Sequence, residues 1–289
     1  MGVYLRPHVL EDALDALREN PLAILAGGTD FYPARVGTPI DDDVLDITAI
    51  KTLRGITLDN GVWRIGALAT WTDLIRTALP PAYDGLKMAA REVGGAQIQN
   101  AGTLVGNICN ASPAADGVPG LLTLDASVEL ASVNGSRAVP LAEFVTGNRT
   151  TLRRPDELVR GLTIPEPAPD AMSSFLKLGA RKYLVISIVM ASFVIEPKGD
   201  AVGRACVAVG ACSAVARRLP ALEAALAGKS IGAALGDTVQ AEHLQGALSP
   251  IDDIRGSGDY RMDAALTLVR RGLSILGGDM TAAQTGSQS

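Results

Sequence analysis

The hydrophobic pattern at the start of the chain predicts a small α/β unit. Residues 9–18 (VLEDALDALR) carry apolar side chains at helical spacing and predict an amphipathic helix. The run PLAILAGG, residues 21–28, predicts a buried strand that ends in a tight glycine loop. A second short strand is predicted at 44–47 (VLDI). Helix, strand, loop and strand in this order indicate an α/β unit.

The pattern changes after residue 54 and predicts an α+β region. Asn60-Gly61 lies between two alternating runs, and Asn-Gly suits a type I′ hairpin turn. Asn134-Gly135 repeats this signal. Helices are predicted at 71–78 and 84–93, and a short buried helix that leads into a strand at 117–125.

A Pro-rich segment at 165–174 (PEPAPDAMSS) predicts a domain boundary. Three strand-like runs follow it, and then helices near 220–227, 233–245 and 259–276. The small, polar tail TAAQTGSQS is predicted to be disordered. The predicted domains are 1–170, with subdomains of about 1–54 and 55–170, then 171–280, and a tail at 281–289.

The composition indicates a globular protein and argues against two classes of partner. Of 289 residues, 47% are hydrophobic and 20% charged, so the chain has enough apolar surface for a large core. The net charge of −5 argues against a nucleic-acid binder, which would present a basic face. The longest apolar run, 183–195, is shorter than the ~20 residues of a membrane span. Without a signal peptide at the N-terminus, we expect a cytoplasmic protein.

The cysteines predict no metal centre in this chain. Cys109, Cys206 and Cys212 are few, widely spaced and form no CxxC pair. An iron–sulfur cluster held by one chain normally takes four thiolates, so no such cluster is expected here.

A first glycine loop, Leu25–Asp30 (LAGGTD), predicts an anion site. Two adjacent glycines let backbone N–H groups approach a ligand with no Cβ in the way. Successive amides of this kind form a concave site suited to a pyrophosphate. Thr29 adds a hydroxyl, and Asp30 is a candidate cap for a helical turn over 30–36. The alternative is an ordinary strand-to-helix turn in which Gly-Gly relieves steric crowding.

A second loop is predicted at 101–116 (AGTLVGNICNASPAAD). It interleaves apolar residues with glycines, asparagines and hydroxyls, and buried polar groups without partners cost roughly 1–3 kcal/mol each. We therefore expect a loop that buries its polar groups against a polar ligand. Gly102, Thr103, Gly106 and Asn107 would contact phosphates, and Asp116 would accept from ribityl or ribose hydroxyls. The alternative is a self-satisfied array of Asx and ST turns.

These two motifs, AGGTD at 26–30 and TLVGNICNASPAAD at 103–116, resemble the FAD-pyrophosphate motifs of the flavoprotein subunit of molybdenum hydroxylases. This is the xanthine dehydrogenase and carbon monoxide dehydrogenase type. The resemblance implies an α+β protein. It has a p-cresol methylhydroxylase/vanillyl-alcohol oxidase (PCMH/VAO) type FAD-binding domain of two α/β subdomains, and an α+β C-terminal domain.

Carried over to this sequence, the resemblance implies a set of FAD-binding residues. They are Ala26, Gly27, Gly28, Thr29, Asp30, Gly102, Thr103, Gly106, Asn107, Asn110, Ser112, Asp116 and, from the C-terminal domain, Lys177. The sequence departs from the usual T-[IL]-G-G-N pattern at one position, because Val105 replaces a glycine. That backbone position must therefore tolerate a Cβ.

Two other features are predicted to carry no chemistry, and the role of Tyr183 is left open. AGKS at 227–230 lacks the earlier glycine of a P-loop, which would fall at Glu223. Cys109 is expected to be a buried packing residue. Tyr183 lies in the region that approaches the flavin ring in the family, although a core tyrosine is the alternative. No catalytic residue is predicted in this chain.

The resemblance implies an electron-transfer subunit. Substrate would be hydroxylated at a molybdenum cofactor on a large partner subunit, and electrons would cross [2Fe-2S] clusters on a small partner subunit to FAD in this chain. A heterotrimer, or a dimer of heterotrimers, is expected. The sequence leaves open NAD, oxygen, a quinone or a cytochrome as acceptor. The alternatives are a self-sufficient FAD oxidoreductase with its own substrate and an interaction subunit that has lost FAD.

Overall fold

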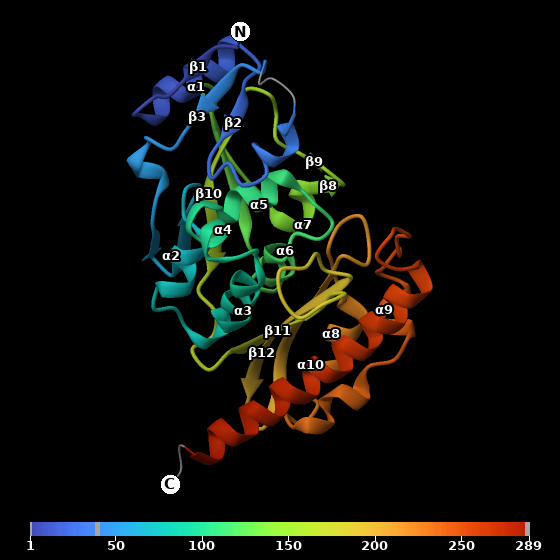
Figure 1. Ribbon diagram of the computed structural model, residues 1–289. Coiled ribbons are helices and arrows are strands. Elements are labelled where there is room, and N and C mark those ends of the chain that lie inside the picture. Colours follow the sequence, from blue (N-terminus) through green and yellow to red (C-terminus); the bar gives the residue numbers. More distant parts are fainter. Residues whose placement is uncertain (1, 38–40, 287–289) are drawn as a thin grey trace. The chain divides into compact units, whose positions relative to one another are not determined.

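The computed structural model describes residues 2–37 and 41–286, which form two compact units (Figure 1). The first unit comprises the described residues up to Thr77 together with Gly94–Ala111 and Asp125–Glu166. The second comprises Ala78–Val93, Ser112–Leu124 and the described residues from Pro167 onward. Each unit is thus assembled from separated segments of the chain. The domain ranges given above remain predictions.

The first unit begins with the predicted α/β arrangement. Three strands form a parallel sheet in the order β1-β3-β2, with β1 at Tyr4–Leu5, β3 at Val44–Asp46 and β2 at Ala23–Leu25. Helix α1 (Leu10–Glu19) connects β1 to β2 and buries Ala13, Leu14 and Leu17. The glycine loop follows the carboxyl end of β2, and the carboxyl ends of parallel strands are where ligands bind in open α/β sheets.

A five-stranded antiparallel sheet forms the rest of the core of the first unit, in the order β4-β5-β10-β6-β7. Its first hairpin turns at Asn60-Gly61, both with positive φ (50° and 74°), as a type I′ turn requires. The second hairpin turns one residue earlier than its Asn-Gly signal, because Gly135 already pairs with Ser132. The strands are β4 (Ile56–Asp59), β5 (Val62–Gly66), β6 (Ser127–Ser132), β7 (Gly135–Pro140) and β10 (Leu158–Pro165).

The prediction of a loop over 101–116 is wrong for residues 104–110, which form helix α5 (Leu104–Asn110). The Thr103 hydroxyl caps this helix by accepting from the Gly106 N–H at 3.0 Å. Leu104, Val105 and Ile108 are buried, so a short amphipathic pattern lies hidden among the glycines and asparagines. The other elements of the unit are η1 (Pro33–Arg35), η2 (Lys51–Leu53), α2 (Trp71–Arg76), α4 (Ala96–Ala101), α7 (Leu141–Phe144), β8 (Val145–Gly147) and β9 (Thr150–Thr151).

The second unit is built on an antiparallel sheet in the order β11-β12-β13-β14, with helices on both faces. Alternate residues of β12 point to opposite faces. Val189, Ala191 and Phe193 join the large core formed with α8 and α10, whereas Met190 packs on the face covered by α3 and α6. Figure 1 shows α10 running along β11 and β12. The strands are β11 (Met172–Leu178), β12 (Val189–Lys198), β13 (Ala201–Gly210) and β14 (Arg217–Arg218).

The helix predicted over 233–245 is broken in the structure into η4 (Ala233–Thr238) and α9 (Glu242–Gln245). The Arg270 guanidinium donates to the Val239 carbonyl at 2.9 and 3.0 Å, so this oxygen is engaged by a side chain at the break. Helix α10 (Gly258–Gly286) continues into the tail predicted to be disordered, of which 287–289 lie outside the described residues. The remaining helices are η3 (Pro81–Tyr83), α3 (Asp84–Glu92), α6 (Gly117–Thr123) and α8 (Pro220–Leu226).

Arg261, near the start of α10, is a buried cation that ties three segments of the second unit together. Its side chain is 1% exposed. It donates to the carbonyls of Ile188 (2.5 Å) and Ala211 (2.7 Å) and to the Asp253 carboxylate (2.6 Å). A buried charge is stable only when such partners surround it. Neither strand alternation nor helical periodicity predicts that Arg261 is buried and holds these three segments together.

A second ion pair, Arg137 with Glu157, braces the first unit. The guanidinium donates to both carboxylate oxygens at 2.6 and 2.8 Å, and Glu157 is 4% exposed. This hydrogen bonding from Arg137 holds the pKa of the Glu157 carboxyl below its ordinary value, against the opposing effect of burial.

Over residues 2–37 and 41–286, none of the helices combines the length and the apolarity that crossing a bilayer demands.

Replacing Arg261 with Met should destabilise the second unit strongly. The substitution leaves the carbonyls of Ile188 and Ala211 without this donor and removes one of the two arginines that pair with Asp253, so we expect a loss of about 3 kcal/mol. Urea unfolding followed by circular dichroism measures it. Arg271→Met, at an exposed position of the same helix, should change stability by less than about 0.5 kcal/mol. Equal midpoints for the two variants would contradict the structural role of Arg261.

Glu157→Gln should reduce stability at neutral pH and have little effect in acid. Because the folded-state pKa of Glu157 is lowered, its contribution is present above the ordinary glutamate pKa and is lost as the pH falls through the folded-state value. We expect a loss of about 1 kcal/mol at pH 7, since Arg137 is one-third exposed. Unfolding free energies at pH 7 and pH 3 test this, and a difference independent of pH would contradict it.

Candidate functional site

In the first glycine turn, Ala26–Asp30, one glycine is needed for its backbone conformation and the other for close packing. Gly28 has a φ of 72°, and a Cβ there would lie 2.7 Å from the Tyr32 ring. Gly27 needs no special φ but lies against backbone, because an added Cβ would be 2.1 Å from the Ala101 carbonyl oxygen. The predicted cap is absent, since Asp30 is exposed and η1 has no side-chain cap.

This turn lies against the start of the second motif, where Ala101 comes 74 residues after Gly27. The contact of Gly27 with Ala101 and Gly102 is backbone to backbone. A Cβ on Gly102 would lie 3.2 Å from the Thr29 hydroxyl. Gly102 and Leu104 are also fixed to the segment at the start of α2. Trp71 N donates to Gly102 O, and Leu104 N donates to Ala69 O, each at 3.2 Å. The structure thus brings Gly27 and Thr29 of the first turn against Gly102 of the second motif.

Within α5 the predicted polar residues divide into engaged and unengaged groups. The Thr103 hydroxyl is used as the helix cap. Asn107 Oδ1 is buried and has no hydrogen-bond partner among the described residues. Val105, which replaces the usual glycine, is 5% exposed and lies on the buried face of α5. A Cβ is therefore accommodated at this position. The alternative, in which the polar groups of this segment hydrogen-bond to one another, therefore accounts for Thr103 but not for Asn107.

Asn110 and Cys109 close the helix. Arg149 donates to the side-chain and main-chain oxygens of Asn110, a contact that the sequence did not predict. Burial raises the pKa of the Cys109 thiol to about 11, so the thiol stays protonated near neutral pH. Ala111 follows with a φ of 47°.

Three predicted residues belong to the second unit, and two of them form an ion pair. Lys177 on β11 contacts Asp116 at 2.7 Å, with side chains 6% and 9% exposed. The Ser187 hydroxyl donates to the other Asp116 oxygen at 2.5 Å. Burial raises the pKa of Asp116, and the ammonium and hydroxyl donors oppose that effect. The third residue, Ser112, accepts from Ala114 N at 3.3 Å in a local turn.

A pocket of about 430 Å³ opens beside Lys177 in the second unit. Lys177, Arg181 and Lys182 give it three cationic residues against one acidic residue, Glu92. Tyr183, on the same loop, is 64% exposed, with the Lys182 ammonium 5.1 Å from its ring centre, so it is not a core residue.

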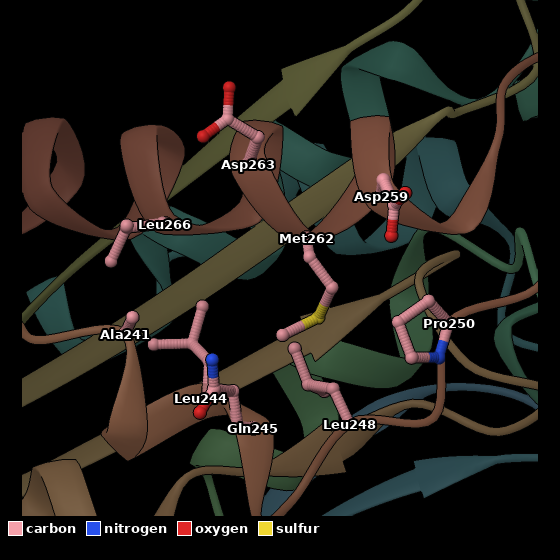
Figure 2. A pocket seen from close by; sticks show the side chains of 9 residues that line it. All are labelled: Ala241, Leu244, Gln245, Leu248, Pro250, Asp259, Met262, Asp263 and Leu266. Carbon is pink, nitrogen blue, oxygen red and sulfur yellow. The ribbon is translucent and has the colours of Figure 1, made fainter.

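A second pocket of about 440 Å³ lies between α9 and the start of α10 (Figure 2). Leu244, Leu248, Met262 and Leu266 face it, and Asp259 and Asp263 lie on the α10 side. It shares no residue with the predicted site. Across residues 2–37 and 41–286, no three His, Cys, Asp or Glu side chains are placed to hold a metal ion.

Sequence reasoning missed Tyr32, Arg149 and Ser187. Tyr32 and Arg149 carry no motif, and their contacts depend on tertiary packing. Ser187 left a weak signal as a hydroxyl inside the apolar run VISIV (185–189), where a buried polar group needs a partner.

Comparison with known proteins identifies the family to which both parts of the chain are similar. Residues 1–167 match the family described as "FAD binding domain in molybdopterin dehydrogenase", and residues 174–276 match "CO dehydrogenase flavoprotein C-terminal domain". These matches confirm the predicted fold class and the predicted FAD cofactor.

Individual relatives agree with the family matches. The nicotinate dehydrogenase FAD-subunit of Eubacterium barkeri is 37% identical over 200 residues, which cover 64% of this chain and 66%, just under two thirds, of that relative. The glyceraldehyde dehydrogenase medium chain of Sulfolobus acidocaldarius is 30% identical over 93% of this chain and 95% of its own.

A solved structure covers almost the whole chain. In carbon monoxide dehydrogenase from Hydrogenophaga pseudoflava, one chain superposes with a TM-score of 0.85 and 28% identity, over 95% of this chain and 96% of that one. With both family matches and a full-length relative in agreement, the resemblance inferred from AGGTD and TLVGN is confirmed, and the protein belongs to the family of FAD-binding subunits of molybdopterin dehydrogenases.

Proposed function

We propose that this chain is the electron-transfer subunit of a molybdenum hydroxylase. It would take electrons from [2Fe-2S] clusters on a small partner subunit and pass them through FAD to a terminal acceptor. FAD exchanges electrons singly or in pairs, which suits a junction between one-electron clusters and a two-electron acceptor. The observation that carries the proposal is the backbone contact between Gly27 and Ala101–Gly102, which brings two glycine turns into one surface.

The residues of the first unit fit a dinucleotide in two respects. The two turns pack closely because neither Gly27 nor Gly102 has a Cβ, and the main-chain amides of such turns suit a diphosphate. The unpartnered Asn107 Oδ1 is an acceptor that a ligand hydroxyl can satisfy. We propose that Ala26, Gly27, Gly28, Thr29, Asp30, Gly102, Thr103, Gly106, Asn107 and Asn110 hold FAD.

The second unit contributes through its buried ion pair in this proposal. Lys177 keeps a cationic group beside the 430 Å³ pocket, and Asp116 supplies its counter-charge within 2.7 Å. Ser112, Asp116 and Lys177 complete the proposed FAD-binding set. The chain itself then binds, orients and desolvates the cofactor, and no acid–base step is assigned to its residues.

The names of the relatives support the proposed partners. They describe a nicotinate dehydrogenase FAD-subunit and medium chains of glyceraldehyde and carbon monoxide dehydrogenases, and subunit names of this kind indicate multi-subunit enzymes. We propose a large molybdenum-cofactor subunit and a small [2Fe-2S] subunit as partners, in a cytoplasmic heterotrimer or its dimer.

Co-purification with reduction of the bound flavin tests the function. The tagged chain is isolated from its native host and analysed for FAD, molybdenum and iron. We expect FAD in the chain, with molybdenum and iron in chains that co-elute. A yellow chain that elutes alone and is reduced by a small substrate would instead indicate a self-sufficient oxidoreductase. A colourless, FAD-free chain would contradict both flavin functions.

Gly27→Ala should remove most of the bound FAD. The new Cβ would lie 2.1 Å from the Ala101 carbonyl oxygen, so the two turns must separate. We expect at least a tenfold fall in FAD per chain, measured by absorbance after denaturation. Gly246→Ala is the matched control, because open space surrounds the position of its Cβ. Full flavin retention in Gly27→Ala would contradict the proposed site.

Asn107→Leu separates the binding role from a structural one. The variant removes a buried acceptor that has no partner, and such groups cost about 1–3 kcal/mol, so the FAD-free protein should unfold at the same or a higher urea concentration. FAD affinity should nevertheless fall. Asn148→Leu, at an exposed position of the same unit, should leave FAD affinity unchanged. A destabilised variant with normal FAD affinity would refute this assignment.

A further inference from the structure

The two oxygens of the Asp116 carboxylate are held by different donors. Lys177 Nζ lies 2.7 Å from Oδ2, and Ser187 Oγ lies 2.5 Å from Oδ1. Lys177 comes from β11, and Ser187 comes from the segment just before β12. Asp116 and Ser187 are 7% and 2% exposed, so water competes little for these bonds. The carboxylate therefore has one orientation set from two sides.

The orientation matters because a carboxylate that rotates loses its alignment with the ammonium. Lys177 reaches Asp116 with a single N–O contact, whereas an ammonium group carries three donors. With Asp116 fixed, one donor is used and the other two stay available beside the 430 Å³ pocket that Lys177 lines. The Ser187 hydroxyl, bonded to the other oxygen of Asp116, opposes rotation of the carboxylate.

We propose that Ser187 is a positioning residue for FAD, which acts by orienting Asp116 so that the Lys177 ammonium is held in place at the edge of its pocket. The inference rests on the proposed FAD function and adds to it a residue outside both glycine motifs. The Ser187 hydroxyl donates to Asp116, so we expect its effect on FAD to pass through that carboxylate.

The charged groups around Asp116 set the direction of the pH effect. Lys177 on β11 and the Ser187 hydroxyl favour the ionised carboxylate, whereas Glu92 on α3 and burial disfavour it. Removing the Ser187 hydroxyl therefore makes Asp116 easier to protonate. A protonated Asp116 no longer holds the Lys177 ammonium in place by its charge, so FAD binding should weaken on acidification at a higher pH than in the unmodified protein.

Titration of the FAD-free full-length chain with FAD, followed by flavin fluorescence, tests the proposal. We expect Ser187→Ala to raise the Kd about tenfold at pH 7, within the range for loss of a hydrogen bond to a charged group. We expect its acid-side weakening to begin at a higher pH. Ser192→Ala is the matched control, because Ser192 is a buried serine on β12 in the same unit, with hydrogen bonds of 3.3 and 3.5 Å to neutral groups.

A double-variant comparison distinguishes positioning from general destabilisation. In an Asp116→Asn background, Ser187→Ala should cause no further loss of FAD affinity, because the carboxylate on which it acts is gone. An equal loss in both backgrounds, or a Kd for Ser187→Ala no higher than for Ser192→Ala, would overturn the role of Ser187 while leaving the proposed function standing. Failure of the unmodified chain to bind FAD would overturn the proposed function itself.

Discussion

The close approach of two backbone segments is the constraint on which the first unit depends. Gly27 leaves so little room beside the Ala101 carbonyl that no other residue fits without moving one of the turns. The approach is possible because β2 delivers its turn at the carboxyl edge of a parallel sheet, while α2 and its bonds to Gly102 and Leu104 fix the opposite side. A surface of main-chain groups results, and the side chains serve to shape it.

Much of this arrangement was predictable because it depends on local rules. Gly-Gly after an apolar run and Asn60-Gly61 between alternating runs each mark a tight turn. Few residue types adopt the backbone conformation of such a turn, so one or two residues are enough to predict it. The family resemblance then supplied FAD, which periodicity alone does not imply. Helix α5 was missed because its apolar positions, Leu104, Val105 and Ile108, are embedded in residues typical of loops.

The rest depends on contacts between distant residues. The break between η4 and α9 involves Arg270, 31 residues beyond the Val239 carbonyl to which it donates. Arg261 looks ordinary in the sequence, and Ser187 stands out only weakly as a hydroxyl in an apolar run, yet each donates to a buried acceptor. Side chains of this kind are specified by the completed fold, so neither propensity nor spacing reveals them.

The interleaving of the two units has a consequence for biosynthesis. Helices α3 and α6 are translated early, but the sheet that they cover begins only at Met172. Until β11 to β13 have left the ribosome, α3 and α6 can contact each other but lack the sheet that they cover in their own unit. The second unit therefore completes its core only late in synthesis, and the nascent chain must be protected from aggregation in the interval.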